Sequence, residues 1–270
     1  MKSHDFGQFL FNSSILNELQ IGEVIKLAKN AKPTLATEAL FLQLVTADEL
    51  TQDDDDFVRS LITPRQVARA LELQDGQSLW MAQALIDNGI ADFLKLDQIL
   101  EKYNDLEIPP IESVLTKYYE KLKSQPDIDF PFAIDVVSNF HSFLSETFKT
   151  SMVLLPPAHH KSETQFGASV KIIGEVPVVV ALLADEKMFF NIAEKYDSYT
   201  ETMEDAYDSI SELLNVFTGQ FVVHVAVTKG LEEVPEPPRY GTNSNIVDTI
   251  AVIGDMGTFY IYIGKQEIFN

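Results

Sequence analysis

The chain contains no cysteine, which excludes disulfide bonds, thiolate nucleophiles and cysteine-ligated zinc together. Basic residues are also scarce. There are 20 lysines and arginines against 41 aspartates and glutamates, and the formal net charge at pH 7 is −21. A field of this sign repels nucleic-acid phosphates and anionic lipid surfaces. The composition therefore argues against nucleic-acid and membrane binding, and it favours a partner with a basic face.

Long apolar runs are missing as well. No stretch reaches the run of about 18 apolar residues that a membrane-spanning helix needs, and the opening MKSHDFGQFLFNSS lacks the small-residue cleavage site of a secretory signal. We therefore expect no membrane span and a cytoplasmic protein. The sequence has 270 residues, of which 46% are hydrophobic, so it can bury a substantial core in one large or two ordinary domains.

Residues 1–125 show a helical pattern with short polar breaks. An apolar pair followed by Ile or Val, five residues after its first member, recurs four times: Leu10-Phe11 with Ile15, Leu40-Phe41 with Val45, Phe57-Val58 with Ile62, and Leu85-Ile86 with Ile90. A helix is expected over Ile62 to Gln74, with Thr63 as its N-cap and Pro64 in its first turn. This half is predicted to be a bundle of helix–turn–helix repeats.

The stretch KSQPDIDFPF, residues 123–132, has two prolines, three charged residues and little periodicity, which is typical of a domain boundary. The pattern after it predicts helices over 133–148, 186–196 and 208–221, a hairpin over 168–184 broken at Gly174-Glu175, and two last strands joined through residues 254–257. We predict an α+β protein. Residues 1–125 form an all-helical domain, and residues 130–270 form a domain of helices packed on an antiparallel sheet.

Several chemically suggestive residues do not make a site. The run Asp53 to Asp56 lacks the alternating ligands, mid-loop glycine and closing glutamate of a calcium loop, and His159-His160 have no identified third ligand. No metal site is expected. His141 and His224 lie within apolar patterns, which predicts that both are packed. No glycine-rich phosphate loop, nucleotide fingerprint or GxSxG elbow occurs.

The segment DSISELLNVFTGQF, residues 208–221, is an amphipathic helix with an unusual polar face. At about 100° per residue, Asp208, Glu212 and Asn215 share one side with Gly219, while the apolar residues take the opposite side. A core helix with a solvated outer face is the simplest interpretation. Asn215 and Gly219 are unusual in such a helix. The amide of an Asn competes for backbone hydrogen bonds and so disfavours helix interiors, and a Gly lowers helix stability by about 1 kcal/mol relative to Ala.

This segment resembles the CheC/CheX/FliY family of chemotaxis phosphatases. The family signature has Asp or Ser, then Glu four residues later, Asn three residues after that, and a proline 21 or 22 residues further on. Asp208, Glu212 and Asn215 match its first part, and Pro237 or Pro238 matches the proline. The resemblance covers residues 130–270. Because only one copy of the motif is present, it is closest to the CheX-like members.

The resemblance implies an enzyme that dephosphorylates the phospho-aspartate of a CheY-type response regulator, with no cofactor of its own, since the regulator carries the magnesium. Asn215 then holds the attacking water and Glu212 pairs with a lysine of the regulator. Asp208 caps the helix or orients its neighbours, Gly219 admits the partner, and the prolines shape a turn. A homodimer is implied by analogy. The alternative is a non-catalytic adaptor that binds a regulator or another signalling protein, with the N-terminal domain as a localising or ligand-sensing module.

Residues 1–125 more faintly resemble the N-terminal domains of type II secretion and pilus ATPases of the MshEN type, some of which bind cyclic di-GMP. Those repeats begin with Arg-Leu-Gly and end with Gln. Here the first repeat begins Asp5-Phe6-Gly7 and has Ala28 at the Gln position, although Gln74 is present in a later repeat. Because an acidic bundle without that arginine has little to grip a phosphate, cyclic di-GMP is not favoured, and this half is interpreted as a regulatory or docking module.

Overall fold

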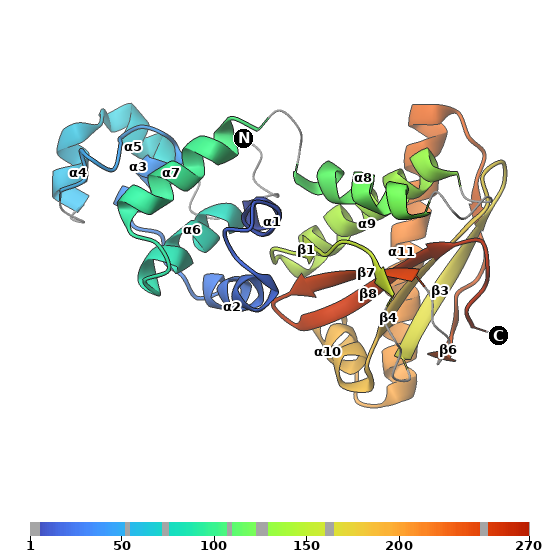
Figure 1. Ribbon diagram of the computed structural model, residues 1–270. Helices are drawn as coiled ribbons and strands as arrows, with labels where there is room; N and C mark the ends of the chain where they lie inside the picture. The colour runs from blue at the N-terminus through green and yellow to red at the C-terminus, as the bar shows by residue number, and fades with distance from the viewer. Residues whose placement is uncertain are drawn as a thin grey trace. The chain divides into compact units, whose positions relative to one another are not determined.

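The computed structural model describes residues 6–51, 55–71, 76–106, 110–122, 129–159, 165–243 and 248–269. The chain divides into two compact units, Met1–Pro110 and Ile111–Asn270. The first unit is helical and the second combines helices with an antiparallel sheet (Figure 1). The predicted α+β fold class is confirmed.

The first unit is a bundle of short helices. They are α1 (Phe6–Asn12), α2 (Glu18–Ala28), α3 (Leu35–Phe41), α4 (Asp55–Leu61), α5 (Pro64–Leu71), α6 (Gln77–Asp87) and α7 (Phe93–Asn104). The predicted start of α5 is confirmed. The Thr63 hydroxyl oxygen accepts a hydrogen bond from the Gln66 N–H (3.3 Å), and the Gln66 side chain accepts one from the Thr63 N–H (2.8 Å), which is a capping box. Residues 72–74 of that predicted helix lie outside the described residues, as does Asp5.

The repeated apolar pair marks the ends of helices. The N–H of Ile15 donates to the carbonyl of Leu10 (3.0 Å) and the N–H of Ile90 to that of Leu85 (2.9 Å). In each case the residue just before the donor has a positive φ, 54° and 65°. This is the Schellman arrangement, in which an apolar residue beyond the turn packs against the last helical turn. In these two copies the spacing of five residues therefore reflects the geometry of a helix C-terminus, whereas after α3 the equivalent bond runs from the Leu44 N–H to the Ala39 carbonyl.

The second unit is built on one eight-stranded sheet with the strand order β1-β7-β8-β4-β3-β5, in which β2 also pairs with β7 and β6 with β3. Every pairing is antiparallel. The strands are β1 (Val153–Leu154), β2 (Ala158–His159), β3 (Gln165–Ile173), β4 (Val178–Ala184), β5 (Val234–Pro235), β6 (Arg239–Asn243), β7 (Asp248–Gly254) and β8 (Gly257–Gly264). Both predicted hairpins, β3–β4 and β7–β8, are confirmed.

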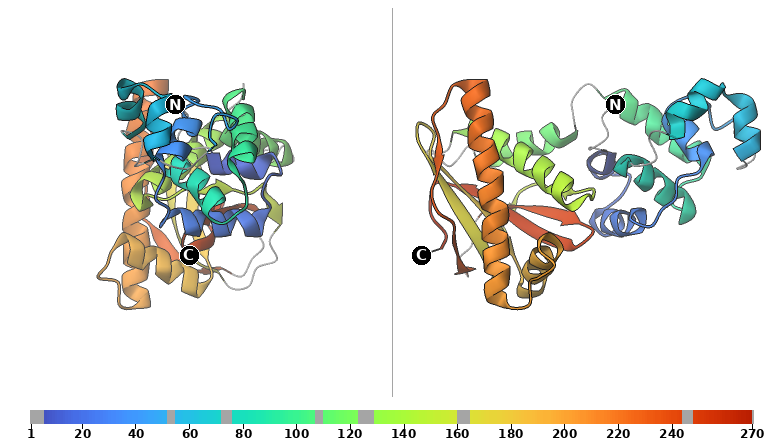
Figure 2. Two further views of the ribbon diagram at one scale, coloured as in Figure 1. Left: turned by 90° about the vertical axis from the view of Figure 1, so that its left-hand side faces the viewer. Right: turned by 180° about the vertical axis from the view of Figure 1, so that it is seen from behind.

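Helices α8 (Pro110–Leu122), α9 (Phe130–Phe148), α10 (Glu186–Tyr196) and α11 (Met203–Lys229) share one hydrophobic core with one face of the sheet. Figure 2 shows α11 lying along this face. Every residue of β4 is buried because its alternate side chains face opposite layers. Val178, Val180 and Leu182 join the helix-side core, whereas residues 179, 181 and 183 form a second cluster on the other face.

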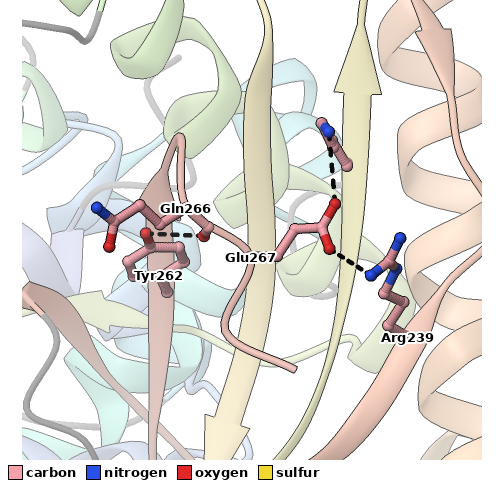
Figure 3. Close-up of polar contacts among 5 residues, drawn as sticks. Arg239, Tyr262, Gln266 and Glu267 are labelled. Atoms are coloured by element: carbon pink, nitrogen blue, oxygen red, sulfur yellow. Dashed lines mark hydrogen bonds and ion pairs between the residues drawn. The ribbon is translucent and has the colours of Figure 1, made fainter. Parts of the chain in front are cut away.

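The C-terminal segment, residues 265–269, covers part of that other face. Phe269 is 4% exposed and packs in the second cluster. The carboxylate of Glu267 pairs with Arg239 and with Lys171, at 3.4 Å from the latter, and the Tyr262 hydroxyl donates to the Gln266 carbonyl at 3.1 Å (Figure 3). The segment thus ties β8 to β3 and β6 across the face opposite the helices.

Two boundaries differ from the sequence prediction. Helix α9 begins at Phe130, inside the stretch interpreted as a linker, because Asp129 accepts a hydrogen bond from the Phe132 N–H (2.9 Å) and Pro131 is tolerated in a first turn. Helix α8 follows the division at residue 110, although it was predicted to end the helical half. Its apolar face, including Leu115 and Tyr118, lies in the core of the second unit.

Among the described helices, α11 is long and apolar enough to cross a membrane. Its buried residues, which include Phe217 and Phe221, contribute to the core of the second unit, and a core helix passes the same test of length and composition. The predicted packing of His141 is confirmed, because it is 3% exposed and its Nε2 lies 2.9 Å from the Met152 carbonyl oxygen. The corresponding prediction for His224 is wrong: it is exposed.

Candidate functional site

The helix that carries the motif begins at Met203 and is capped at both ends. The Thr202 hydroxyl oxygen accepts from the Asp205 N–H (3.2 Å), and the Asp205 carboxylate accepts from the Thr202 hydroxyl (2.7 Å) and from the Thr202 N–H (2.8 Å). These hydrogen bonds, the hydroxyl's first, lower the pKa of Asp205. Gly230 ends the helix with φ 71°. Asp208 therefore lies beyond the first turn, and its suggested role as a cap is wrong.

The apolar side of this helix forms the centre of the core, as predicted. Leu213 and Leu214 are fully buried. The Phe217 ring lies 4.5 Å from that of Phe140, and the Phe221 ring lies 5.5 Å from that of Phe132, measured between centroids. Both aromatic partners belong to α9, so the two helices fix each other. This packing sets the rotation of α11 and therefore the direction in which its polar residues point.

The opposite side of the helix is open. Asp208, Glu212 and Asn215 are exposed, and among the described residues none of these three side chains has a hydrogen-bond or ion-pair partner. A Cβ placed on Gly219 would meet nothing within 4 Å. The four residues predicted to form the site thus share one accessible face, and its polar side chains make no contact that stabilises the described fold.

An acidic hollow of about 380 Å³ adjoins the first half of this face. It is lined by Tyr196, Asp197, Tyr199, Asp205, Asp208, Ser209 and Glu212. Burial raises the pKa of Tyr196, and the negative charges of Glu212 and Asp197 raise it further. A phenol in this position stays neutral at physiological pH, and the surrounding carboxylates favour a cation over an anion. The hollow suits an ammonium or guanidinium group.

Pro237 and Pro238 lie between β5 and β6 on the edge of the sheet. Across them the register with β3 shifts, so that Val170 and Lys171 face the three residues 236–238. This is a β-bulge. Proline has no N–H to give to a ladder, and it is tolerated at bulges and on edge strands. The sequence expectation that a proline shapes the chain here is met by a bulge rather than a tight turn.

The motif's long spacing brings the prolines back to the level of Asn215. From Asn215 to the end of α11 the chain rises about 21 Å, at about 1.5 Å per residue. After Leu231 the chain returns through β5 (Val234–Pro235), and the six residues to Pro237 can span at most about 20 Å, at about 3.3 Å per residue. The rings of Tyr207 and Tyr240 stack with centroids 4.7 Å apart, which ties the start of α11 to β6. The chain that carries the prolines therefore runs back along α11, within reach of the turns that carry Glu212 and Asn215.

Sequence reasoning missed the aromatic part of the site. Tyr196 ends α10 and Tyr199 lies in the following loop, where it is 85% exposed. The Thr200 and Ser209 hydroxyl oxygens lie 3.1 Å apart and bind this loop to α11. The dense run YDSYTETMED was the available signal, but only the folded chain places Tyr196 beside Glu212.

Among the described residues, no group of three or more His, Asp or Glu side chains could hold a metal ion. Residues 53 and 54 of the aspartate run and His160 lie outside the described residues. The face on α11 consists of two carboxylates, one amide and a glycine. Such a set can position a water molecule and a cationic side chain without a metal of its own.

No protein-family model matches the chain, and no curated protein matches it. Solved structures similar to it include a chemotaxis protein CheX from Desulfovibrio desulfuricans, with a TM-score of 0.39 and 17% identity, which covers 49% of this chain and 97% of that one. A CheC-like superfamily protein from Shewanella sp. PV-4 has a TM-score of 0.40 and 17% identity over 49% of this chain and 95% of its own.

A third similar structure is the complex of CheX with CheY, BeF3 and magnesium from Borrelia burgdorferi. Its TM-score is 0.40 and its identity 20%, over 49% of this chain and 96% of that one. These neighbours are chemotaxis proteins of the CheX and CheC-like group, the same group that the motif resembles. The similarity covers about half of this chain, and the MshEN-type resemblance of residues 1–125 stays a prediction.

Proposed function

We propose that the second unit is a CheX-like phosphatase that hydrolyses the phospho-aspartate of a CheY-type response regulator. The observation that carries the proposal is the face of α11. Glu212 and Asn215 are exposed and have no partner among the described residues, and Gly219 leaves the next turn open. Because the fold does not use these polar groups, they are available to another molecule.

Asn215 would orient the attacking water. The transition state of phosphoryl transfer is loose, and the regulator's own magnesium neutralises the developing charge, so the phosphatase has to supply mainly position. The amide oxygen of Asn215 accepts a hydrogen bond from the water and aims its lone pair at phosphorus. The phosphorus–oxygen bond to the aspartate breaks, and inorganic phosphate and a free carboxylate leave. A neutral amide does this without adding negative charge beside the phosphoryl group.

Glu212 would hold the regulator rather than face its phosphate, since two anions repel each other. It borders the acidic hollow together with Asp208, and a lysine of the regulator entering there would form charge-assisted hydrogen bonds. Helix positions three residues apart lie side by side, so the lysine contact at Glu212 and the water at Asn215 would be set by one rigid element. Asp208 would add charge to the cation's site.

The substitution Asn215→Ala tests the assignment. We expect the rate of regulator dephosphorylation to fall by roughly 100-fold, as is typical when one positioned hydrogen-bonding group is removed from a catalytic site. The assay follows the decay of phosphorylated CheY-type regulator with each variant. Thermal unfolding should hardly change, because the side chain is exposed and has no partner among the described residues.

Gln220→Ala is the matched control, because Gln220 is an exposed amide residue on the same helix, pointing about 140° away from Asn215. It should leave the rate unchanged. If Asn215→Ala hydrolyses the acyl phosphate as fast as the wild type, the catalytic assignment fails. Tight binding of the regulator without faster hydrolysis by the wild type would instead favour the adaptor function.

A further inference from the structure

The open face of α11 continues past the polar residues as an apolar stripe. Val223 is 62% exposed and Val227 is 81% exposed, and Ala226 between them is exposed as well. At about 100° per residue, these residues and Gly219 all point within about 60° of Glu212. We call Gly219, Val223, Ala226 and Val227 the docking stripe. It is neutral, whereas the other end of the same face carries Asp208 and Glu212.

The distances along the helix make the stripe part of the same contact. Val223 lies about 12 Å and Val227 about 18 Å from Asn215, at about 1.5 Å per residue. A regulator-sized domain is about 30 Å across. A partner of that size seated on Asn215 therefore extends well beyond Val223, unless it overhangs one end of the helix. Two exposed valines within reach of a docked domain represent apolar area that the contact would remove from water.

We propose that the docking stripe supplies affinity for the response regulator by binding an apolar patch beside its phosphorylation site, while Glu212 and Asn215 supply orientation and chemistry. This inference rests on the proposed function. The division fixes the direction of docking: the lysine-bearing side of the regulator faces the acidic hollow, and its apolar patch faces Val223 and Val227. A face that is acidic at one end and apolar at the other selects a partner surface whose basic and apolar parts are arranged to match.

A second copy of the chain is a poorer occupant of this face. If two α11 helices paired antiparallel about a two-fold axis, the Asp208 and Glu212 end of one would lie on the valines of the other. The carboxylates would then be desolvated without partners. A parallel pair would place carboxylates against carboxylates. In both arrangements the unfavourable free energy of the carboxylates exceeds the gain from burying the valines. A regulator with a lysine at one end and an apolar patch at the other pairs with both the acidic and the apolar part of the face.

The test separates affinity from chemistry in steady-state dephosphorylation of a purified CheY-type regulator by the full chain. We expect the double variant Val223→Ser/Val227→Ser to raise KM about tenfold or more while kcat stays within about twofold, because apolar contacts that persist from ground state to transition state change only binding. Asn215→Ala should show the reverse, with kcat lowered and KM little changed. Leu19→Ser, at a side chain that is also 81% exposed, is the control and should change neither constant.

An unchanged KM in the double variant, or a fall in kcat alone, overturns the proposed role of the docking stripe. So does sedimentation showing that the double variant turns a dimer into a monomer, since the stripe would then be a self-interface. If the wild type does not accelerate dephosphorylation, the proposed function has failed, and the stripe is tested separately by calorimetric titration with the regulator bound to beryllofluoride and magnesium. Binding that weakens about tenfold in the double variant supports the stripe, and unchanged or undetectable wild-type binding overturns it.

Discussion

Gly219 combines a structural cost with an open environment. A glycine inside a helix loses about 1 kcal/mol relative to alanine, and at this position nothing in the fold requires it, because a Cβ would meet no atom within 4 Å. Because this glycine weakens the helix and relieves no crowding within the fold, its presence is best explained by a partner molecule that approaches the helix closely here. Asn215, which also disfavours helix interiors, lies one turn before it.

We therefore predict that Gly219→Ala stabilises the protein and impairs its activity. Its free energy of unfolding should rise by about 1 kcal/mol, since the helical backbone accepts the methyl group and the unfolded chain loses freedom. Its KM for phosphorylated regulator should rise as well, and that of Gly219→Leu further. Urea denaturation and the steady-state assay measure the two effects. If Gly219→Ala is stabilised but Gly219→Leu has the same KM and kcat as the wild type, the partner does not approach closely at this residue.

At the scale of the element, the ends of α11 matter as much as its faces. The capping box of Thr202 and Asp205 starts the helix five residues before the motif, and Gly230 stops it. The sequence pattern located the motif helix and its buried side correctly, because amphipathic spacing fixes both. It did not predict that the helix begins at Met203, although the spacing of Thr202 and Asp205 that forms the capping box is present in the sequence.

The cap gives a pH dependence with a definite sign. Because hydrogen bonds lower the pKa of Asp205 in the folded state below its ordinary 3.8, the ionised carboxylate contributes stability above that value, and the contribution is lost as the pH falls through the lowered pKa. Asp205→Ala should therefore unfold at lower urea concentration than the wild type at pH 7, and the difference should shrink below pH 3.8. Asp208→Ala, which removes an exposed carboxylate that has no hydrogen-bond or ion-pair partner among the described residues, is the control and should unfold at the same urea concentration as the wild type at pH 7.

At the scale of the whole molecule, the division between the units is set by packing rather than by composition. The proline-containing stretch at residues 123–132 suggested a boundary after α8, but α8 buries Ile111, Val114, Leu115 and Tyr118 in the core of the second unit. Amphipathic periodicity shows that a helix has an apolar face, but it does not show which core that face joins. The same limit explains why Tyr196 was missed at the site: its neighbour Glu212 lies on another helix.

This assignment of α8 predicts different behaviour for two fragments. Residues 111–270 should unfold cooperatively, because they keep the complete core. Residues 130–270 lack four buried side chains and should be less stable by several kcal/mol, at roughly 1.5 to 3 kcal/mol for each large apolar group exposed. Thermal or urea unfolding followed by circular dichroism compares them. Equal stabilities would show that α8 contributes nothing to the second unit.

The proline bulge on the edge of the sheet has a consequence for self-association. An edge strand with a regular row of N–H and C=O groups invites another chain to extend the sheet, and such growth leads to aggregation. Here the β5–β6 edge is interrupted at Pro237 and Pro238, and the described strands at the opposite edge, β1 and β2, have two residues each. Neither described edge offers a long, regular template. The protein can thus keep a highly apolar central strand such as β4 without exposing the sheet to cross-β stacking.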